Sequence, residues 1–406
     1  MSLTLCLIMN NSVTLNQEID HEVRRFLFLG NGWFPVCPGG QERYLYELTC
    51  QLIQEKNWVD LLAFGIPSST ESNSRLTESN SRLRLINLGQ PNSPLWKRFT
   101  TIRKRFSERG AFKEDAINLH FPLCSFPLLS QLPTNIPVTL TFHGPWALES
   151  LQEGESRISV FLKYCLEKRV YQRCDRFIVL SDAFGMILHD NYQVPWEKIH
   201  VIPGGVDVKR FQLNLSRQEA RAKLNWPQDR LILFTPRRLV HRMGIDKLLT
   251  ALAQTRSEIS EVWLAIAGKG PLRAALEHQV EELNLSNHVK FLGYLPDEQL
   301  PIAYQAADLT VIPSQALEGF GLVLLESLAC GTPAICTPVG GMPEVIKPFA
   351  PECITDSIDA DAIREKLESF LNGDLSLPSR MDCRKYAETN YSWLNIAPRV
   401  REVLLA

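Results

Sequence analysis

The chain has 406 residues, of which 45% are hydrophobic, and a chain of this length usually divides into two hydrophobic cores, so we expect two domains. Its 43 basic and 45 acidic side chains nearly balance, which argues against a nucleic-acid-binding protein. Ten cysteines without a CxxC pair indicate buried thiols in a reducing compartment and argue against a disulfide framework.

The N-terminal apolar stretch, residues 3–9, is short and has no basic segment before it. No uninterrupted apolar run reaches the roughly 18 residues that a membrane-spanning helix needs. We therefore expect a cytoplasmic protein rather than a secreted or membrane-spanning one.

The first half of the chain alternates short apolar runs with amphipathic stretches. The run at 25–30 predicts a strand that ends in glycine, and the loop after it leads into a predicted helix over 41–54. Further strands are predicted at 61–65, 83–88, 117–121, 138–142 and 176–180, and a further helix at 160–171. This alternation predicts an α/β domain with a parallel, doubly wound sheet.

The alternation starts again in the second half, where strands are predicted at 231–235, 262–267, 289–292, 309–312, 333–336 and 352–354. Between the two series, the sequence VIPGGVD at 201–207 breaks every periodic pattern, so we place the hinge there. We expect one domain over 1–203 and a second over 204–390. The helical pattern at 391–406 follows a serine N-cap signal, and we expect this helix to pack back on the first domain.

Two stretches of the first half stand out from the alternation. The heptad TESNSRL occurs at 70–76 and again at 77–83, and we interpret it as a duplicated loop. The stretch 96–113 holds seven basic residues and one acid, with apolar residues at helical spacing. Such a helix either packs on the core with a solvated basic face or docks on a polyanionic acceptor or on anionic lipid at the inner face of a membrane. The apolar residues are Trp96, Phe99, Ile102 and Phe106.

The strongest motif lies in SQALEGFGLVLLESLACG, where Glu318 and Glu326 flank a glycine loop that begins a helix over 322–329. Free amides in the first turn of a helix, together with its dipole, make an anion site that suits a diphosphate. The two carboxylates are suited to hydroxyls of a sugar and a ribose. Either acid alone is better explained by capping or solvation, but the paired spacing around a glycine loop favours function. The loop and first helical turn comprise Gly319, Phe320, Gly321 and Leu322.

This stretch resembles the E-x7-E signature of glycosyltransferase family 4. The resemblance implies the GT-B fold, in which two Rossmann-like domains face each other across a cleft, and retaining transfer of a hexose from a nucleotide sugar. It also implies that no metal or other cofactor is needed. Gly39 and Gly40 in PGGQER match the family's first glycine loop, which implies amides facing the donor diphosphate and the acceptor. A tight turn is the structural alternative.

His143 in FHGPW follows a predicted strand, so it faces the crevice of a doubly wound sheet, and the resemblance implies contact with the transferring sugar. Arg238 in PRRLVHRMGIDKLL matches the arginine that neutralises the donor pyrophosphate. The family's lysine falls on Met243 in this chain. We expect Arg242, one residue earlier, or Arg237 acting with Arg238, to supply the second cation.

Gly268 in GKGP and Tyr294 in FLGYL also match the family, and Tyr294 resembles the edge that binds the base. The segment GKGPLRA partly imitates a dinucleotide fingerprint, but Arg273 replaces its third glycine, which disfavours an NAD enzyme. Asp359 and Asp361 imitate a metal-binding pair. They precede a predicted helix at 362–371, so we expect caps there and no metal site.

Together these matches imply a hexosyltransferase that acts on a glycan or lipid-linked acceptor in polysaccharide or glycolipid synthesis. UDP-glucose is the default donor on family frequency alone. A sugar-nucleotide sensor, a GT-B phosphorylase and an epimerase are the alternatives, and no nucleic acid or obligate protein partner is expected. The implied catalytic residues are His143, Arg238 and Glu318. The implied donor-binding residues are Gly39, Gly40, Arg242, Gly268, Tyr294, Gly319, Phe320, Gly321, Leu322 and Glu326.

Overall fold

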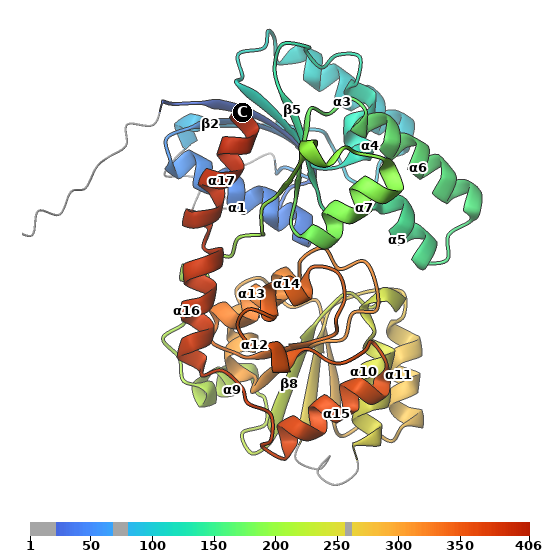
Figure 1. The fold of residues 1–406 in the computed structure, drawn as a ribbon, viewed down its shortest axis with the longest axis vertical. Helices are drawn as coiled ribbons and strands as arrows, with labels where there is room; N and C mark the ends of the chain where they lie inside the picture. The colour runs from blue at the N-terminus through green and yellow to red at the C-terminus, as the bar shows by residue number, and fades with distance from the viewer. Residues whose placement is uncertain (1–21, 68–79, 256–261) are drawn as a thin grey trace, which may run out of the picture.

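The protein is described by a computed structural model that covers residues 22–67, 80–255 and 262–406 (Figure 1). Its described residues form two sheets, which lie one above the other in Figure 1. The first has the strand order β3-β2-β1-β4-β5-β6-β7 and the second the order β10-β9-β8-β11-β12. Helices flank both sheets, and every strand pair is parallel, so the predicted pair of doubly wound α/β units is confirmed.

The first sheet is built from apolar strands covered on both faces, as parallel strands between two helical layers require. Strands β4 and β5 are buried at every position. Strand β7 was not predicted, because it has only three residues and its central His200 interrupts any apolar run. The strands are β1 (Arg25–Gly32), β2 (Trp58–Phe64), β3 (Leu83–Asn87), β4 (Ala116–Leu119), β5 (Val138–Phe142), β6 (Arg176–Val179) and β7 (Ile199–Val201).

Serine side chains begin two of the helices that cover the first sheet. Ser156 accepts a hydrogen bond from the Ser159 amide, and Ser181 accepts one from the Phe184 amide, so each satisfies a free donor of the first helical turn. The helices are α1 (Gly40–Gln54), η2 (Asn80–Arg82), α3 (Leu95–Glu108), α4 (Pro122–Ser125), η3 (Phe126–Leu128), α5 (Trp146–Gln152), α6 (Arg157–Tyr171), α7 (Asp182–Tyr192) and η4 (Trp196–Lys198).

The predicted strand at 352–354 is wrong. The chain forms the short helix η7 (Pro351–Cys353) there, and Ile354 makes only an isolated bridge with Cys336. Pro351 has no amide hydrogen to donate to a strand ladder and favours the start of a helical turn. The strands of the second sheet are β8 (Leu231–Pro236), β9 (Val262–Ala267), β10 (Val289–Gly293), β11 (Leu309–Ile312) and β12 (Ala334–Cys336).

The last helix of the chain, α17 (Trp393–Leu405), lies against α1 of the first domain (Figure 1). Ser392 caps it, and the ring of Trp393 packs edge-on against Tyr44, with the ring centroids 5.1 Å apart. The other helices that follow β7 are α8 (Val208–Phe211), α9 (Arg217–Leu224), η5 (His241–Met243), α10 (Ile245–Gln254), α11 (Arg273–Glu282), α12 (Leu300–Ala306), α13 (Leu322–Ala329), α14 (Met342–Ile346), α15 (Ala360–Leu371) and α16 (Arg380–Tyr391).

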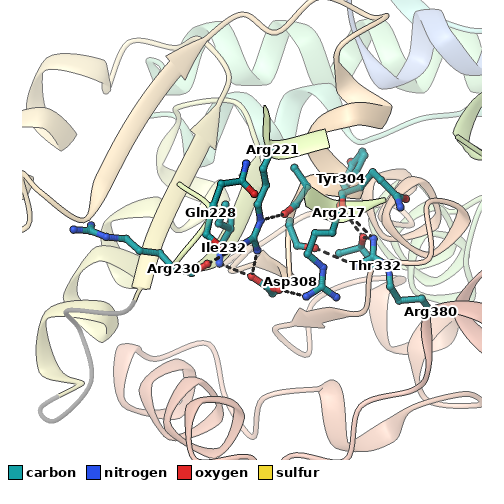
Figure 2. Close-up of polar contacts among 12 residues, drawn as sticks. Arg217, Arg221, Gln228, Arg230, Ile232, Tyr304, Asp308, Thr332 and Arg380 are labelled. Carbon is teal, nitrogen blue, oxygen red and sulfur yellow. Dashed lines mark hydrogen bonds and ion pairs between the residues drawn. The ribbon is translucent and has the colours of Figure 1, made fainter. Parts of the chain in front are cut away.

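A buried ionic network lies at the amino end of β11 (Figure 2). Asp308 pairs with Arg217 and Arg221 and accepts a hydrogen bond of 2.7 Å from the Ile232 amide. Arg380 joins the network's edge through the Thr332 hydroxyl at 2.9 Å. Ligands of doubly wound sheets bind at the carboxyl ends of the strands, so this network is structural.

The N-terminal stretch 3–9 and the duplicated heptad, apart from its last four residues, lie outside the described residues. Across 22–67, 80–255 and 262–406, no helix combines the length and apolar character that crossing a bilayer requires. The predicted basic helix at 96–113 is confirmed only as far as Glu108, where α3 ends. Its apolar stripe divides: Ile102 and Phe106 are buried, whereas Trp96 is exposed.

Candidate functional site

Residues that follow strands of the first sheet contact the loop before helix α13, as the Ser181 hydroxyl after β6 does with the Gly319 carbonyl. Gly321 begins α13 with φ of 82°, a left-handed conformation that favours glycine, and no side chain caps the helix. A Cβ placed on Gly40 would lie 3.8 Å from a methyl of Leu322. The uncapped amides of α13 therefore lie beside the first glycine loop, as the sequence predicts for an anion site.

Helix α1 is less suited to an anion. Its N-cap residue, Gly39, is extended and makes no side-chain cap, but the carboxylate of Glu42 folds back onto the first turn and bonds its own amide. Burial raises the pKa of Glu42. The start of α13 is therefore better suited to an anion than the amides of Gly39 and Gly40.

Glu318, the first acid of the E-x7-E motif, is held by Arg237. The Arg237 Nη2 atom lies 2.5 Å from Glu318 Oε2, and the hydroxyl of Ser314 donates to the same oxygen at 3.2 Å. Both contacts fall on Oε2, so Oε1 has no hydrogen-bond partner among the described residues. This oxygen is available to a sugar hydroxyl.

Arg238, the residue after the buried Arg237, is exposed. Within the described residues it makes no ion pair. Burial raises the pKa of Glu42 on α1 and of Glu149 on α5; the charge of Arg238 opposes both shifts, and Glu318 adds to the shift of Glu149. Arg238 and Glu318 therefore both lie near Glu149.

Arg242, the predicted substitute for the family lysine, is already paired across the domains. Its guanidinium lies 3.4 Å from Glu149 and 3.7 Å from Glu153, and it donates to the Leu317 carbonyl at 3.1 Å. Met243, at the lysine position, is buried. The geometry favours a role for Arg242 in joining the domains, which sequence reasoning missed because Glu149 lies far away in the chain.

Glu326, the second acid, occupies a different environment from Glu318. It is buried, accepts a hydrogen bond of 2.8 Å from Tyr304, and lies 3.6 Å from the Nε atom of Arg43 on α1. Burial raises its pKa, and Arg43 opposes that shift. Glu326, Arg43 and Trp393 line a small cavity between the domains.

The loop residues between the two acids contact the first domain. The hydroxyl of Ser181 donates to the Gly319 carbonyl at 2.6 Å, and a Cβ on Gly319 would lie 2.8 Å from the ring of Phe184. The Phe320 ring is buried, 5.8 Å from that of Tyr391. The side chain of Phe320 therefore anchors the loop, and we expect only backbone groups here to face a donor.

His143 follows β5, as predicted, and is paired with a second histidine that sequence reasoning missed. Its Nε2 atom lies 3.0 Å from Nδ1 of His120, which follows the neighbouring strand β4. Burial lowers the pKa of His143 to about 3 and places that of His120 well below its usual value. Both imidazoles are neutral near pH 7, so His143 can bind a sugar hydroxyl but does not carry a charge.

Glu167 on α6 takes the place of a missing cap on α5. Helix α5 begins three residues after His143, and Pro145 at its N-cap makes no side-chain bond. The fully buried Glu167 carboxylate instead accepts a hydrogen bond from the Ala147 amide at 3.2 Å and one from Tyr192 at 2.7 Å. It therefore fixes the start of the helix that follows His143.

We expect Glu167→Gln to change how stability depends on pH. Burial raises the pKa of Glu167 to about 7, whereas the unfolded carboxyl titrates near about 4.3. The folded state releases this proton at a higher pH than the unfolded state does. The free energy of unfolding of the wild type therefore falls as pH rises between these two values. Glutamine does not titrate. The free energy of unfolding of the variant, measured by urea unfolding, should therefore rise by about 2 to 3 kcal/mol relative to that of the wild type between about pH 5 and about pH 8. A difference between the two free energies of unfolding that does not change with pH would contradict the raised pKa of Glu167.

Gly268 and Tyr294 lie at the carboxyl ends of β9 and β10. Gly268 has φ of 145°, and a Cβ there would overlap the carbonyl oxygen of Arg237, so the close approach requires glycine. Tyr294 is exposed, and the Lys269 ammonium lies 5.4 Å from its ring centroid. Lys269 was not predicted, although its position between two glycines signals access to the crevice.

Tyr294→Ala should weaken nucleotide binding about tenfold, because stacking on one aromatic ring contributes roughly 1 to 1.5 kcal/mol. Tyr294→Phe keeps the ring and should bind as the wild type does. Calorimetry with a nucleoside diphosphate measures both. Equal losses in the two variants would assign the effect to the hydroxyl instead of the ring.

The acidic pair at the start of α15 only partly follows the prediction. Asp359 occupies the N-cap position but makes no capping bond, and instead accepts a hydrogen bond of 3.0 Å from Ser357. Asp361 lies 3.8 Å from Arg364 on the next turn. In the described part of the chain, no group of three metal-ligand side chains is gathered.

Part of the predicted set lies close together. Arg238 and Glu318 both act on Glu149 of α5, and His143 lies three residues before the start of that helix. Glu326 lies toward the hinge, and Tyr294 lies at the outer edge of the second sheet.

The described geometry agrees with the families that the sequence matches. Residues 38–210 match the description Glycosyltransferase Family 4, and residues 216–390 match Glycosyl transferases group 1. A D-inositol 3-phosphate glycosyltransferase of Corynebacterium urealyticum is 31% identical over 321 residues, which cover 75% of this chain and 74% of that protein. An uncharacterized glycosyltransferase of Methanocaldococcus jannaschii is 30% identical over 386 residues, which cover 89% of this chain and 93% of that protein.

A third relative is the GDP-mannose-dependent alpha-(1-6)-phosphatidylinositol monomannoside mannosyltransferase of Mycolicibacterium smegmatis. It is 31% identical over 221 residues, and the match spans 52% of this chain and 57% of that enzyme.

Two solved structures share the fold. Sucrose-phosphate synthase from Thermosynechococcus elongatus superimposes with a TM-score of 0.77 at 24% identity, covering 94% of this chain and 98% of that one. The Anabaena HepE protein in complex with UDP-glucose superimposes with a TM-score of 0.73 at 19% identity, covering 94% of this chain and 99% of that one. The chain therefore has the GT-B fold, belongs to glycosyltransferase family 4 and is a hexosyltransferase.

Proposed function

We propose that this enzyme transfers a hexose from a nucleoside-diphosphate sugar to a lipid-linked or glycan acceptor, with retention of the anomeric configuration. The observation that carries the proposal is the juxtaposition of an uncommitted Arg238, the uncapped end of α13 and the free Oε1 of Glu318. A cation and a helix dipole suit a diphosphate, and the carboxylate suits a hexose hydroxyl.

Catalysis in this scheme rests on the charge that develops as the diphosphate departs. Arg238 and the α13 amides stabilise that charge, while Glu318 and the neutral His143 orient the hexose. The acceptor hydroxyl attacks the anomeric carbon from the face that the diphosphate leaves, and a leaving phosphate oxygen takes its proton. The protein supplies the positive charge itself, so no metal ion enters the proposed reaction.

The relatives favour GDP-mannose over UDP-glucose as the donor. Three of them are named as GDP-mannose-dependent mannosyltransferases that act on phosphatidylinositol mannosides. The expectation of UDP-glucose rests only on family frequency. We therefore place GDP-mannose first, and we propose a lipid-linked acceptor reached by peripheral contact with the inner face of a membrane, to which α3 contributes.

A thermal-shift panel of GDP-mannose, UDP-glucose and UDP-N-acetylglucosamine tests the donor, because a bound ligand raises the unfolding temperature. Turnover of the stabilising donor is then followed with and without acceptor, in the presence of EDTA, and the product's anomeric configuration is read by NMR. Acceptor-dependent, retained product supports the proposal. Binding without turnover would indicate a sensor, and change of the donor alone would indicate an epimerase.

A further inference from the structure

Helix α6 exposes an apolar face to solvent. Ile158, Phe161 and Leu162 are 75%, 63% and 62% exposed, and their spacing places them on one side of the helix. Cys165, one turn later, continues the same face and is also exposed. A helix on a soluble surface normally carries polar residues there, so this face needs an apolar occupant.

Positive charge borders that face. Arg157 and Arg169 are exposed at its two ends, and the only acid on α6, Glu167, is fully buried beneath it. Helix α3 lies nearby, because both helices contact the short helix η3, and Phe126 of η3 is partly exposed between them. At its start α3 adds exposed apolar and basic residues of its own, namely Leu95, Trp96 and Lys97.

We propose that the outer face of α6, defined by Ile158, Phe161 and Leu162 with Arg157 and Arg169, docks on an anionic lipid bilayer. A bilayer with anionic headgroups offers both an apolar phase for the stripe and negative charge for the arginines. A second copy of the chain fits less well, because a symmetric contact would place the arginines of one copy against those of the other.

The same helix connects this surface to the reaction crevice. From the inner side of α6, Glu167 bonds the Ala147 amide at the start of α5, next to the His143 loop. A bilayer on the outer side would therefore lie beside the crevice. This reading rests on the lipid-linked acceptor of the proposed function, because only such an acceptor needs the crevice at a membrane.

Vesicle flotation of the full chain tests the surface. Phosphatidylcholine vesicles with phosphatidylglycerol should carry the wild type, and pure phosphatidylcholine vesicles should carry much less. The combined change Ile158→Ser, Phe161→Ser and Leu162→Ser should lower the bound fraction at least about tenfold, since three apolar side chains no longer leave water. Arg157→Glu with Arg169→Glu should abolish the preference for phosphatidylglycerol.

The matched control replaces apolar residues that are as exposed but lie elsewhere. Met381 on α16 and Leu394 on α17 are 76% and 61% exposed, and their change to serine should leave flotation unchanged. Flotation that survives the α6 change, or falls equally in the control, would overturn the proposal. So would a wild type that sediments as a dimer without lipid and becomes monomeric on the α6 change.

Nucleotide binding, measured by calorimetry on every variant, shows that each one is folded. Loss of vesicle binding with intact donor turnover on a detergent-dispersed acceptor confirms the surface and leaves the proposed function standing. Vesicle binding without any turnover would instead contradict the proposed function and leave the surface unaffected.

Discussion

Arg238→Ala should lower turnover by about two to three orders of magnitude while affinity for the donor falls less. Arg238 makes no ion pair with any described residue, whereas Arg237 and Arg242 are paired with Glu318, Glu149 and Glu153. Its charge is therefore free to meet a phosphate. That interaction strengthens as the diphosphate leaves, so its removal acts mainly on the transition state.

Steady-state kinetics with varied donor separates the two effects. Arg238→Lys keeps the charge but not the planar fork, and should retain part of the rate. Arg230→Ala is the matched control. Arg230 donates a hydrogen bond of 2.8 Å to the Asn287 carbonyl, and it lies near the network of Figure 2, away from the crevice. Equal losses in turnover and donor affinity for Arg238→Ala would argue that this arginine only binds the donor.

Arg237→Ala should destabilise the fold by about 3 to 5 kcal/mol. The Glu318 side chain is only 12% exposed, and without Arg237 its charge has the Ser314 hydroxyl alone as a partner. Urea unfolding measures the loss. Glu318→Gln removes the charge, so the double variant should recover stability relative to Arg237→Ala.

Glu318→Gln alone separates stability from chemistry. It should lose less stability than Arg237→Ala, because the glutamine oxygen can still accept a hydrogen bond from the buried Arg237, and it should lose turnover because the amide is a weaker acceptor for a sugar hydroxyl than the carboxylate. A double variant as unstable as Arg237→Ala would show that the cost of losing Arg237 comes from packing and not from the unpaired charge.

The strands could be predicted from the sequence because parallel strands covered on both faces must be apolar along their length. Strands β5 and β9 match their predicted bounds residue for residue. The same rule fails for β7, whose three residues are only partly buried, and at 352–354, where a short apolar pattern is equally compatible with a turn. Short segments carry too little periodicity to distinguish these structures.

The site could be predicted only as far as its local motifs extend. The E-x7-E spacing placed Glu318 and Glu326 around α13, but it did not show which of two adjacent arginines would pair with Glu318. Arg237 and Arg238 follow the end of β8, where successive side chains point to opposite sides, so one is buried and the other exposed.

The long-range partners left no signal in the sequence. His120 pairs with His143 across two strands, Glu149 meets Arg242 across the two domains, and Glu326 meets Arg43 on α1. Each pairing depends on the assembled fold. An isolated acid or histidine in the sequence has many structural explanations, and only its neighbours in space decide among them.

The most direct test compares nucleotides that differ by one phosphate. Calorimetry with GDP and GMP, and in parallel with UDP and UMP, measures the contribution of the second phosphate in the wild type and in Arg238→Ala. The crevice described above predicts that the wild type prefers the diphosphate at least about tenfold and that Arg238→Ala loses most of this preference. Equal affinity for diphosphate and monophosphate in the wild type, or an undiminished preference in the variant, would contradict it.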